Sequence, residues 1–293
     1  MLNYSNFAIV ASIFGLWINS FLSHQLQLWL GFVLIFSFGV LHGSNDLALF
    51  ENINARSGAV NYKFLFYYVV AVIAGAALFY LIPSLALATF ILVSGYHFGE
   101  QQWINQISLE INWLKFLFQL VYGLLILFLI FTFQAEEVGQ IVFEITSRQI
   151  PSSYFLNGLK IIGVILGILG TLVYLKSNNF KNVILRELFY LLVFIIIFKV
   201  SSLIWGFALY FILWHSIPSM QDQIKFLYGK IDVKSIKSYL WNAFPYWIIS
   251  LIGLTLLYIF LKDQKIFNAL FFSFLASITF PHVIVIIKMF DKR

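Results

Sequence analysis

Apolar runs long enough to cross a bilayer follow one another along almost the whole chain. Each run holds about 17–25 residues, which is the length that an α-helix needs to span the hydrocarbon core. Only 10% of the residues are charged, whereas a soluble domain carries about a quarter charged residues. Because segments in lipid must satisfy their own backbone hydrogen bonds, helices are expected rather than short alternating strands. The sequence therefore predicts an all-α, polytopic transmembrane helix bundle.

Eight to ten spans fit the pattern, and ten is the best interpretation. We expect them, within a single integral-membrane domain over residues 1–293, at 6–22, 26–50, 64–82, 83–99, 114–134, 154–175, 184–198, 201–218, 244–261 and 266–290. The span at 184–198 is short enough to be a re-entrant or interfacial segment instead. With ten spans, most of the 18 Lys and Arg residues fall on one side of the membrane. The positive-inside rule then places both termini in the cytoplasm of a multi-pass cell-membrane protein.

The remaining segments carry weaker signals. Residues 219–243 alternate lysines with apolar residues, which predicts one amphipathic helix on the cytoplasmic face. Residues 135–153 are either a similar helix or a solvated connector. The N-terminus has no basic region followed by a cleavage site, so no cleavable signal peptide is predicted. The net charge of +6 reflects loop lysines and arginines, so no nucleic-acid partner is expected.

Four of the five histidines lie inside the predicted spans, at His42, His97, His215 and His282. Each falls about 14–16 residues from the expected start of its span, which is roughly 21–24 Å along a helix. The four spans run in the same direction in the predicted topology, so the four imidazoles share one depth. A lone imidazole in a membrane helix can simply bridge two helices by hydrogen bonds. Four at one depth favour a shared metal ion, whereas His24 lies in a predicted loop as a solvated residue.

Acidic residues follow two of these histidines. Asp46 comes four residues after His42, and Glu100 comes three residues after His97. A carboxylate in an apolar span is costly unless it is paired, and it can orient a ligating histidine by accepting its second ring N–H. Simple snorkelling to the interface is the alternative for Glu100. Pro281 precedes His282, and the local helix break that it can cause is common at membrane sites and also in ordinary kinks.

The chain has no cysteine, so thiolate sites, disulfides and iron–sulfur clusters are excluded. Imidazole ligands suit iron, zinc or copper. The sequence alone does not choose among these metals.

Four short motifs together resemble the Brp/Blh family of bacterial and archaeal β-carotene 15,15′-dioxygenases. They are His42-Gly43-x-x-Asp46, Tyr96-His97-Phe98-Gly99, Trp214-His215-Ser216 and Pro281-His282, and they occur in the family's order. The resemblance implies a membrane enzyme that uses Fe²⁺ and dioxygen to cleave the central double bond of β-carotene, or of a related carotenoid, giving two retinal molecules. It also implies that the retinal could pass to a rhodopsin.

The resemblance implies iron ligation by His42, His97 and His215. The family usually has a further histidine four residues after the last of these, where this chain has Ser219. We expect His282 to complete the site, because its predicted depth matches. A site with three protein ligands, or a lost or altered activity, is the alternative.

The residues beside the expected ligands predict the substrate contacts. Tyr96, Phe98 and Trp214 can stack on a conjugated polyene near the metal, although most aromatic residues in such a chain serve membrane packing and interfaces. No general acid or base is assigned, because alkene cleavage by dioxygen requires none.

Three other functions compete with cleavage. A di-metal oxygenase needs closely spaced histidines, which this sequence lacks. A transporter needs charges near the bilayer midplane, and Asp46 alone gives little support. A non-catalytic carotenoid- or retinal-binding membrane protein remains open because of Ser219.

Overall fold

The computed structural model describes residues 4–54, 62–261 and 264–292. Regular structure in these residues is entirely helical, which confirms the prediction of an all-α fold. The chain divides into two compact units. Unit 1 comprises Met1–Ile35, Ile91–Gln140 and Arg148–His215, and unit 2 comprises Phe36–Phe90, Ile141–Ser147 and Ser216–Arg293. The single integral-membrane domain stays a prediction.

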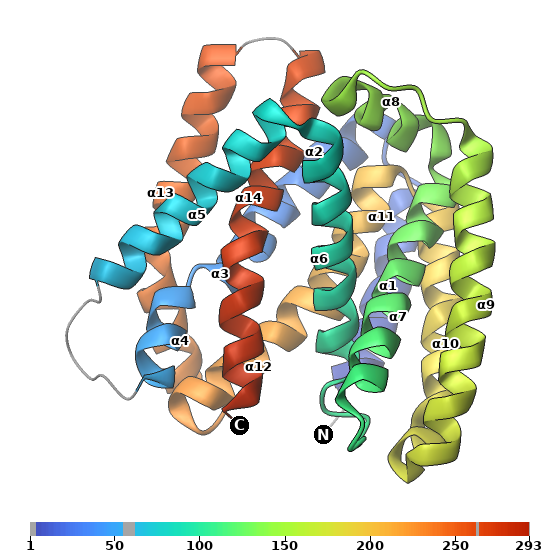
Figure 1. Ribbon diagram of the computed structural model, residues 1–293. Helices are drawn as coiled ribbons and strands as arrows, with labels where there is room; N and C mark the ends of the chain where they lie inside the picture. The colour runs from blue at the N-terminus through green and yellow to red at the C-terminus, as the bar shows by residue number, and fades with distance from the viewer. Residues whose placement is uncertain (1–3, 55–61, 262–263, 293) are drawn as a thin grey trace. The chain divides into compact units, whose positions relative to one another are not determined.

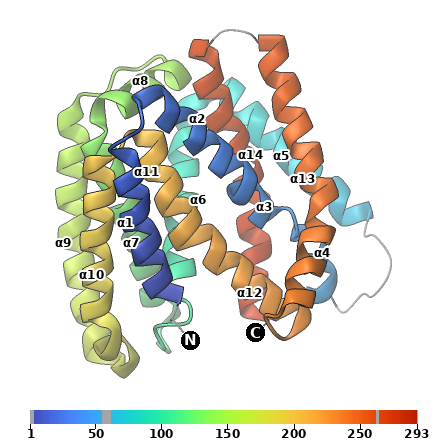
Figure 2. The ribbon, with the colours of Figure 1, turned by 180° about the vertical axis from the view of Figure 1, so that it is seen from behind.

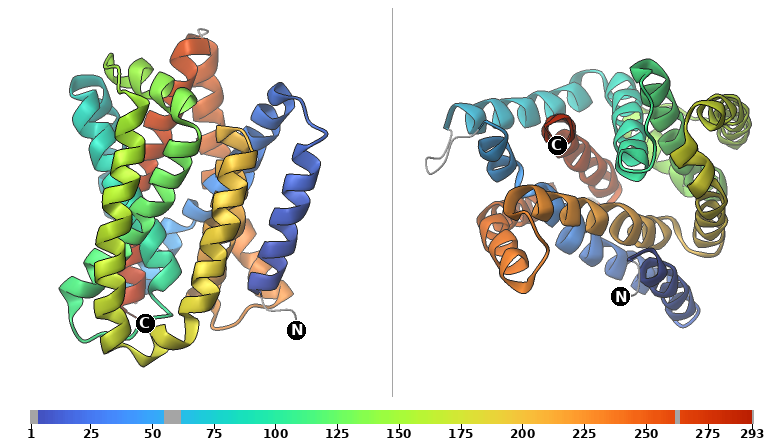
Figure 3. Two further views of the ribbon diagram at one scale, coloured as in Figure 1. Left: turned by 90° about the vertical axis from the view of Figure 1, so that its right-hand side faces the viewer. Right: turned by 90° about the horizontal axis from the view of Figure 1, so that it is seen from below.

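Unit 1 is a bundle of long apolar helices. Its elements are α1 (Tyr4–Asn19), α2 (His24–Leu34), most of α6 (Pro83–Trp103), α7 (Asn112–Phe133), the start of α8 (Ala135–Thr146), α9 (Ser152–Lys176), α10 (Asn178–Val200), α11 (Leu203–Tyr210) and the π-helical segment η2 (Phe211–Ser216). Helices α7 and α9 lie side by side, as Figure 1 and the left view of Figure 3 show. Helix α11 packs on α2 and α10. Most side chains of α11, the helix that continues into η2, are therefore buried.

Glycines allow α6 and α7 to touch backbone to backbone. A Cβ added at Gly99 would lie 1.7 Å from the carbonyl oxygen of Gln119, and one added at Gly123 would lie 1.7 Å from that of Gly95. Such close approach through small residues is a common way for membrane helices to pack. Because residues two apart point to opposite sides of a helix, His97 lies on the face of α6 away from α7.

Unit 2 is also built of helices, several of them short. Its elements are the π-helical segment η1 (Ile35–Gly39, of which Ile35 belongs to unit 1), α3 (Val40–Gly43), α4 (Asp46–Ile53), α5 (Tyr62–Leu81), the start of α6, the end of α8, α12 (Ile217–Tyr228), α13 (Val233–Leu261) and α14 (Gln264–Asp291). Helix α14 packs along α5 and also contacts α4 and α13. Figure 2 shows α14 beside α13. Phe79, Ala86 and Ala276 form a buried apolar cluster between α5, α6 and α14.

Six helical segments in the described parts of the chain are long and apolar enough to cross a membrane. They are His24–Ile53, Tyr62–Leu81, Asn112–Phe133, Ser152–Lys176, Leu203–Tyr228 and Phe272–Asp291. In α5 and α9, only 11% of the most apolar window is buried inside the protein. A helix that is apolar but so exposed needs lipid as its solvent. The protein is therefore an integral membrane protein.

The ten-span topology stays a prediction, although each expected span overlaps a helix. The doubtful span at 184–198 belongs to α10, which has 23 residues but is not among these six segments, so its crossing stays a prediction. Pro281 does not break its helix, because α14 runs through it.

The prediction of one amphipathic helix over residues 219–243 is wrong. Helix α12 ends at Tyr228, and Gly229 after it has a φ of 75°, the left-handed conformation that closes helices. Helix α13 starts at Val233, where the Asp232 carboxylate accepts the backbone N–H of Ser235. A hydrogen bond from Lys230 lowers the pKa of Asp232, so this cap is ionised. The cap and the glycine split the segment. By contrast, residues 135–146 of the other connection are helical, as α8.

Candidate metal centre

His42 and His282 form a buried pair in unit 2. Their ring centroids are 4.9 Å apart and their planes are perpendicular. His42 lies in α3, directly after the wide turn of η1, and its Nδ1 donates to the backbone carbonyl of Gly39 in that turn. π-helical turns are frequent at functional sites.

Asp46 contacts the second member of this pair. The helix is interrupted after Gly43, so Asp46 begins a new helix instead of following His42 on the same one. Its Oδ1 accepts the Nδ1–H of His282 at 2.8 Å, and its Oδ2 accepts the Tyr68 hydroxyl at 2.8 Å. Asp46 is therefore paired, as its cost in an apolar segment requires. The histidine that it orients is distant in sequence.

These contacts fix which nitrogen of each ring can bind a metal. A carbonyl or a carboxylate only accepts hydrogen bonds, so Nδ1 carries the proton in both His42 and His282. In a neutral imidazole the lone pair then resides on Nε2, which is the form that ligates metals. A carboxylate or carbonyl on the other ring nitrogen is the usual partner of a metal-bound histidine. The residues of unit 2 thus fit a metal ion.

His97 and His215 form the corresponding pair in unit 1. Their ring centroids are 4.6 Å apart, with an angle of 78° between the planes, and both rings are buried. His215 lies in η2, so a π-helical segment accompanies one histidine of each pair. Pro218 lies three residues on and has no N–H to donate to the Trp214 carbonyl, which disfavours regular α-helical bonding there.

Aromatic rings border the second pair. Phe98 lies 4.7 Å from the His215 ring, and Phe211 stacks on it at 5.4 Å with an angle of 14°. Tyr96 packs against Phe116 and donates its hydroxyl to Glu100 at 2.9 Å. Glu100 is only 2% exposed, so it does not snorkel to the surface.

Trp214 faces other helices of unit 1. Its indole N–H donates to Ser12 at 3.0 Å, and its ring contacts Tyr190 and Phe194 of α10. His24, the remaining histidine, is the first residue of α2, and its exposed side chain lies 3.3 Å from Glu137. The role of Trp214 in substrate binding stays a prediction.

Tyr68 was not predicted from the sequence. It lies in an apolar helix among other tyrosines, and nothing in its spacing links it to Asp46. Only the packing of α14 against α5 and α4 reveals the relationship.

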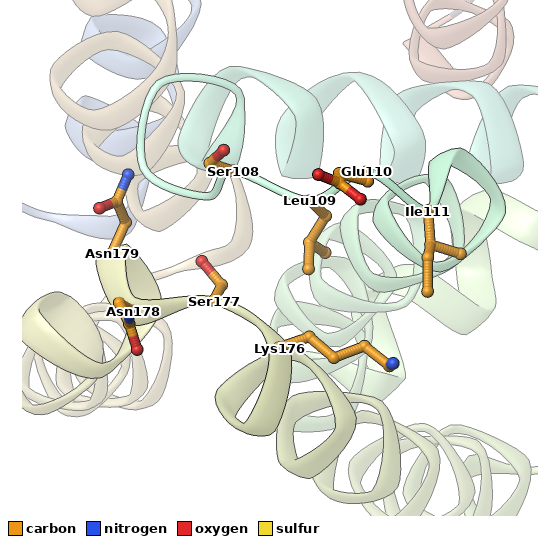
Figure 4. Close-up of a pocket in the computed structure, with 8 residues that line it drawn as sticks. All are labelled: Ser108, Leu109, Glu110, Ile111, Lys176, Ser177, Asn178 and Asn179. Carbon is orange, nitrogen blue, oxygen red and sulfur yellow. The ribbon is translucent and has the colours of Figure 1, made fainter.

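A surface pocket of about 530 Å³ lies elsewhere in unit 1. Figure 4 shows that its lining comes from residues 108–111, between α6 and α7, and from residues 176–179 at the junction of α9 and α10. None of the four buried histidines lines it.

Comparison with known proteins identifies a family. No curated protein and no solved structure matches the chain. A family model described as "BCD: Beta-carotene 15,15'-dioxygenase" matches residues 33–290, which include the four buried histidines, Asp46 and Tyr68. That match covers most of the chain and confirms the resemblance seen in the four motifs. The protein belongs to the β-carotene 15,15′-dioxygenase family.

Proposed function

We propose that this protein is an iron-dependent dioxygenase that cleaves the central double bond of β-carotene, or of a related carotenoid, into two retinal molecules. The observation that carries the proposal is the pair of buried histidines in each unit, in a chain of this family. In unit 2 the hydrogen bonds also hold both rings in the form that ligates metals. Buried imidazoles without a role would be a costly feature of apolar helices.

The proposed ligands are His42, His97, His215 and His282, binding one Fe²⁺. Four neutral imidazoles bring no negative charge, so the bound ion would keep its full positive charge and its affinity for further electron-rich ligands. Iron bound there would supply the one-electron chemistry that reaction with dioxygen needs. Both oxygen atoms end in the two aldehyde groups that replace the broken double bond, so no further reductant is required.

The chain's own residues would orient the ligands and bind the polyene. Asp46 holds His282, and the Gly39 carbonyl holds His42. Phe98, against the ring of His215, and Tyr96 are the proposed contacts of the conjugated chain near the metal. Trp214 contributes to this surface less directly, because its ring packs against α10. Glu100 would act through Tyr96.

The substrate comes from the bilayer in which it is dissolved. An apolar carotenoid offers no polar group at its centre, so the central bond would be selected by equal lengths of chain on either side of the metal. The retinal product is as apolar as the substrate and would leave into the same cell membrane, where a rhodopsin could bind it.

Ser219 favours a second candidate function. The family usually has a histidine at this position, so a carotenoid- or retinal-binding protein without catalysis is the alternative. Expression in β-carotene-producing cells separates the two. Loss of orange colour with formation of retinal supports cleavage, and unchanged colour with co-purified pigment supports binding alone.

Metal analysis of the purified protein tests the iron proposal. We expect about one iron per chain when it is purified without chelator. Two metals per chain would favour a di-metal oxygenase, and a preference for zinc or copper would overturn the choice of iron.

A further inference from the structure

The backbone at His42 is held by side chains from two other helices. Helix α3 ends one residue later, and the last carbonyls of a helix need partners from outside it. The carbonyl of His42 accepts Nε2–H of Gln223 at 2.9 Å. The hydroxyl of Tyr239 lies 3.4 Å from the same carbonyl and shares its single proton between it and a closer acceptor on Gln223. Gln223 is fully buried in α12, and Tyr239 is 1% exposed in α13.

Gln223 uses both ends of its amide. Its second N–H donates to the hydroxyl of Ser219 at 3.1 Å, and its Oε1 accepts the Tyr239 hydroxyl at 2.8 Å. Asn45 closes the arrangement by donating from its side chain to the Tyr239 carbonyl at 3.1 Å. A buried hydrogen-bond network of this kind is sensitive to the loss of one member.

We propose that Gln223, with Ser219 and Tyr239, positions His42 for metal binding. The inference rests on the proposed function, because it assigns these residues a role toward the same ion. Gln223 fixes the backbone of His42 from one side, and the Gly39 carbonyl fixes its ring from the other. Together they determine where Nε2 points. Partners that bond to the ring of a ligating histidine change metal affinity by about 10–100-fold when they are removed. Gln223 acts through the backbone of His42, so we expect an effect at the lower end of that range.

The same network accounts for the serine at position 219. Ser219 is fully buried, and its hydroxyl is the acceptor that the Gln223 amide needs. An imidazole there would displace the amide from the His42 carbonyl. Serine therefore serves the positioning of His42, and the position is not an emptied ligand site.

Titration of the purified full-length protein with Fe²⁺, and separately with Co²⁺ as a spectroscopic probe, tests the proposal. Gln223→Leu should weaken metal binding by about 10-fold or more and change the cobalt absorption spectrum. The matched control is Gln134→Leu. Gln134 also donates its amide to backbone carbonyls, those of Phe198 and Ser201 at 2.8 and 2.7 Å, and neither of these acceptors belongs to a histidine. Its loss should leave affinity and spectrum unchanged.

Two milder variants guard against a failure to fold. Tyr239→Phe removes one hydroxyl and should weaken binding in the same direction as Gln223→Leu. Ser219→His should also weaken binding, whereas an emptied ligand site predicts tighter binding. Unchanged affinity and spectrum in Gln223→Leu and Tyr239→Phe would overturn the proposal, as would a gain in Ser219→His. The proposed function would survive either outcome, provided that the wild-type protein binds one iron and cleaves β-carotene. If wild-type protein binds no metal, the proposed function falls as well.

Discussion

The Nδ1–H of His282 donates to Oδ1 of Asp46 at 2.8 Å, although 236 residues separate the two in sequence. The bond joins the last long helix to the helix that follows the first buried histidine. It sets which ring nitrogen of a proposed ligand carries the hydrogen, and it pairs a carboxylate buried in an apolar unit.

Replacing Asp46 by Asn keeps the shape of the side chain but removes its charge. We expect Asp46→Asn to weaken iron affinity by about 10–100-fold and to leave binding detectable. Competition with a colorimetric chelator measures the change. Asp232→Asn, at the exposed start of α13, is the control and should not alter affinity. Equal affinity in both variants would contradict the role of Asp46.

Tyr68 tests the same carboxylate from its other side. Tyr68→Phe removes the hydroxyl that Asp46 accepts but leaves the bond to His282. We expect a smaller loss of iron affinity than in Asp46→Asn, under about 10-fold. Tyr67→Phe changes the adjacent, exposed tyrosine of the same helix and should have no effect. A loss of the same size in both variants would point to a general effect on α5.

The histidines should differ sharply in their response to alanine. We expect His42→Ala, His97→Ala and His215→Ala each to abolish iron binding and carotenoid cleavage. His24→Ala should do little, because His24 is exposed and its side chain lies beside Glu137, away from the proposed ligands' hydrogen bonds. Metal analysis and retinal formation are measured together.

His282→Ala decides between four and three protein ligands. If it abolishes iron binding, His282 belongs to the ligand set. If cleavage and iron content persist, the site has three histidine ligands, and His282 would be a packing partner of His42.

The contact of α6 with α7 predicts a strong effect of small changes. Gly99→Ala would place a methyl group against the carbonyl of Gln119, so we expect a loss of roughly 1–3 kcal/mol or more in stability. Gly163→Ala in α9 is the control, because a Cβ there meets nothing within 4 Å. Melting temperature in detergent should fall for Gly99→Ala only. A similar melting temperature for both would mean that the two helices can separate without cost.

The helical class and the four buried histidines could be predicted from the sequence, because apolar length and rare imidazoles are local signals. The partner of Asp46 could not, since α3 ends at Gly43 and the carboxylate meets a helix from the far end of the chain. The lysine pattern over residues 219–243 favours one continuous helix and gives no sign that Gly229 takes the left-handed conformation that closes α12. The link of Gln223 to His42 joins residues 181 apart in sequence, so no local pattern predicts it.

The wide turns before His42 and around His215 also constrain how the chain could vary. Each residue turns an α-helix by about 100°. A single deletion within Ile35–Gly39 would therefore rotate the following helix, with His42 on it, by about that angle relative to the preceding one. His42 would then face a different neighbour while its sequence motif stayed intact. A relative could thus keep every motif residue and still lose its chemistry through one missing codon.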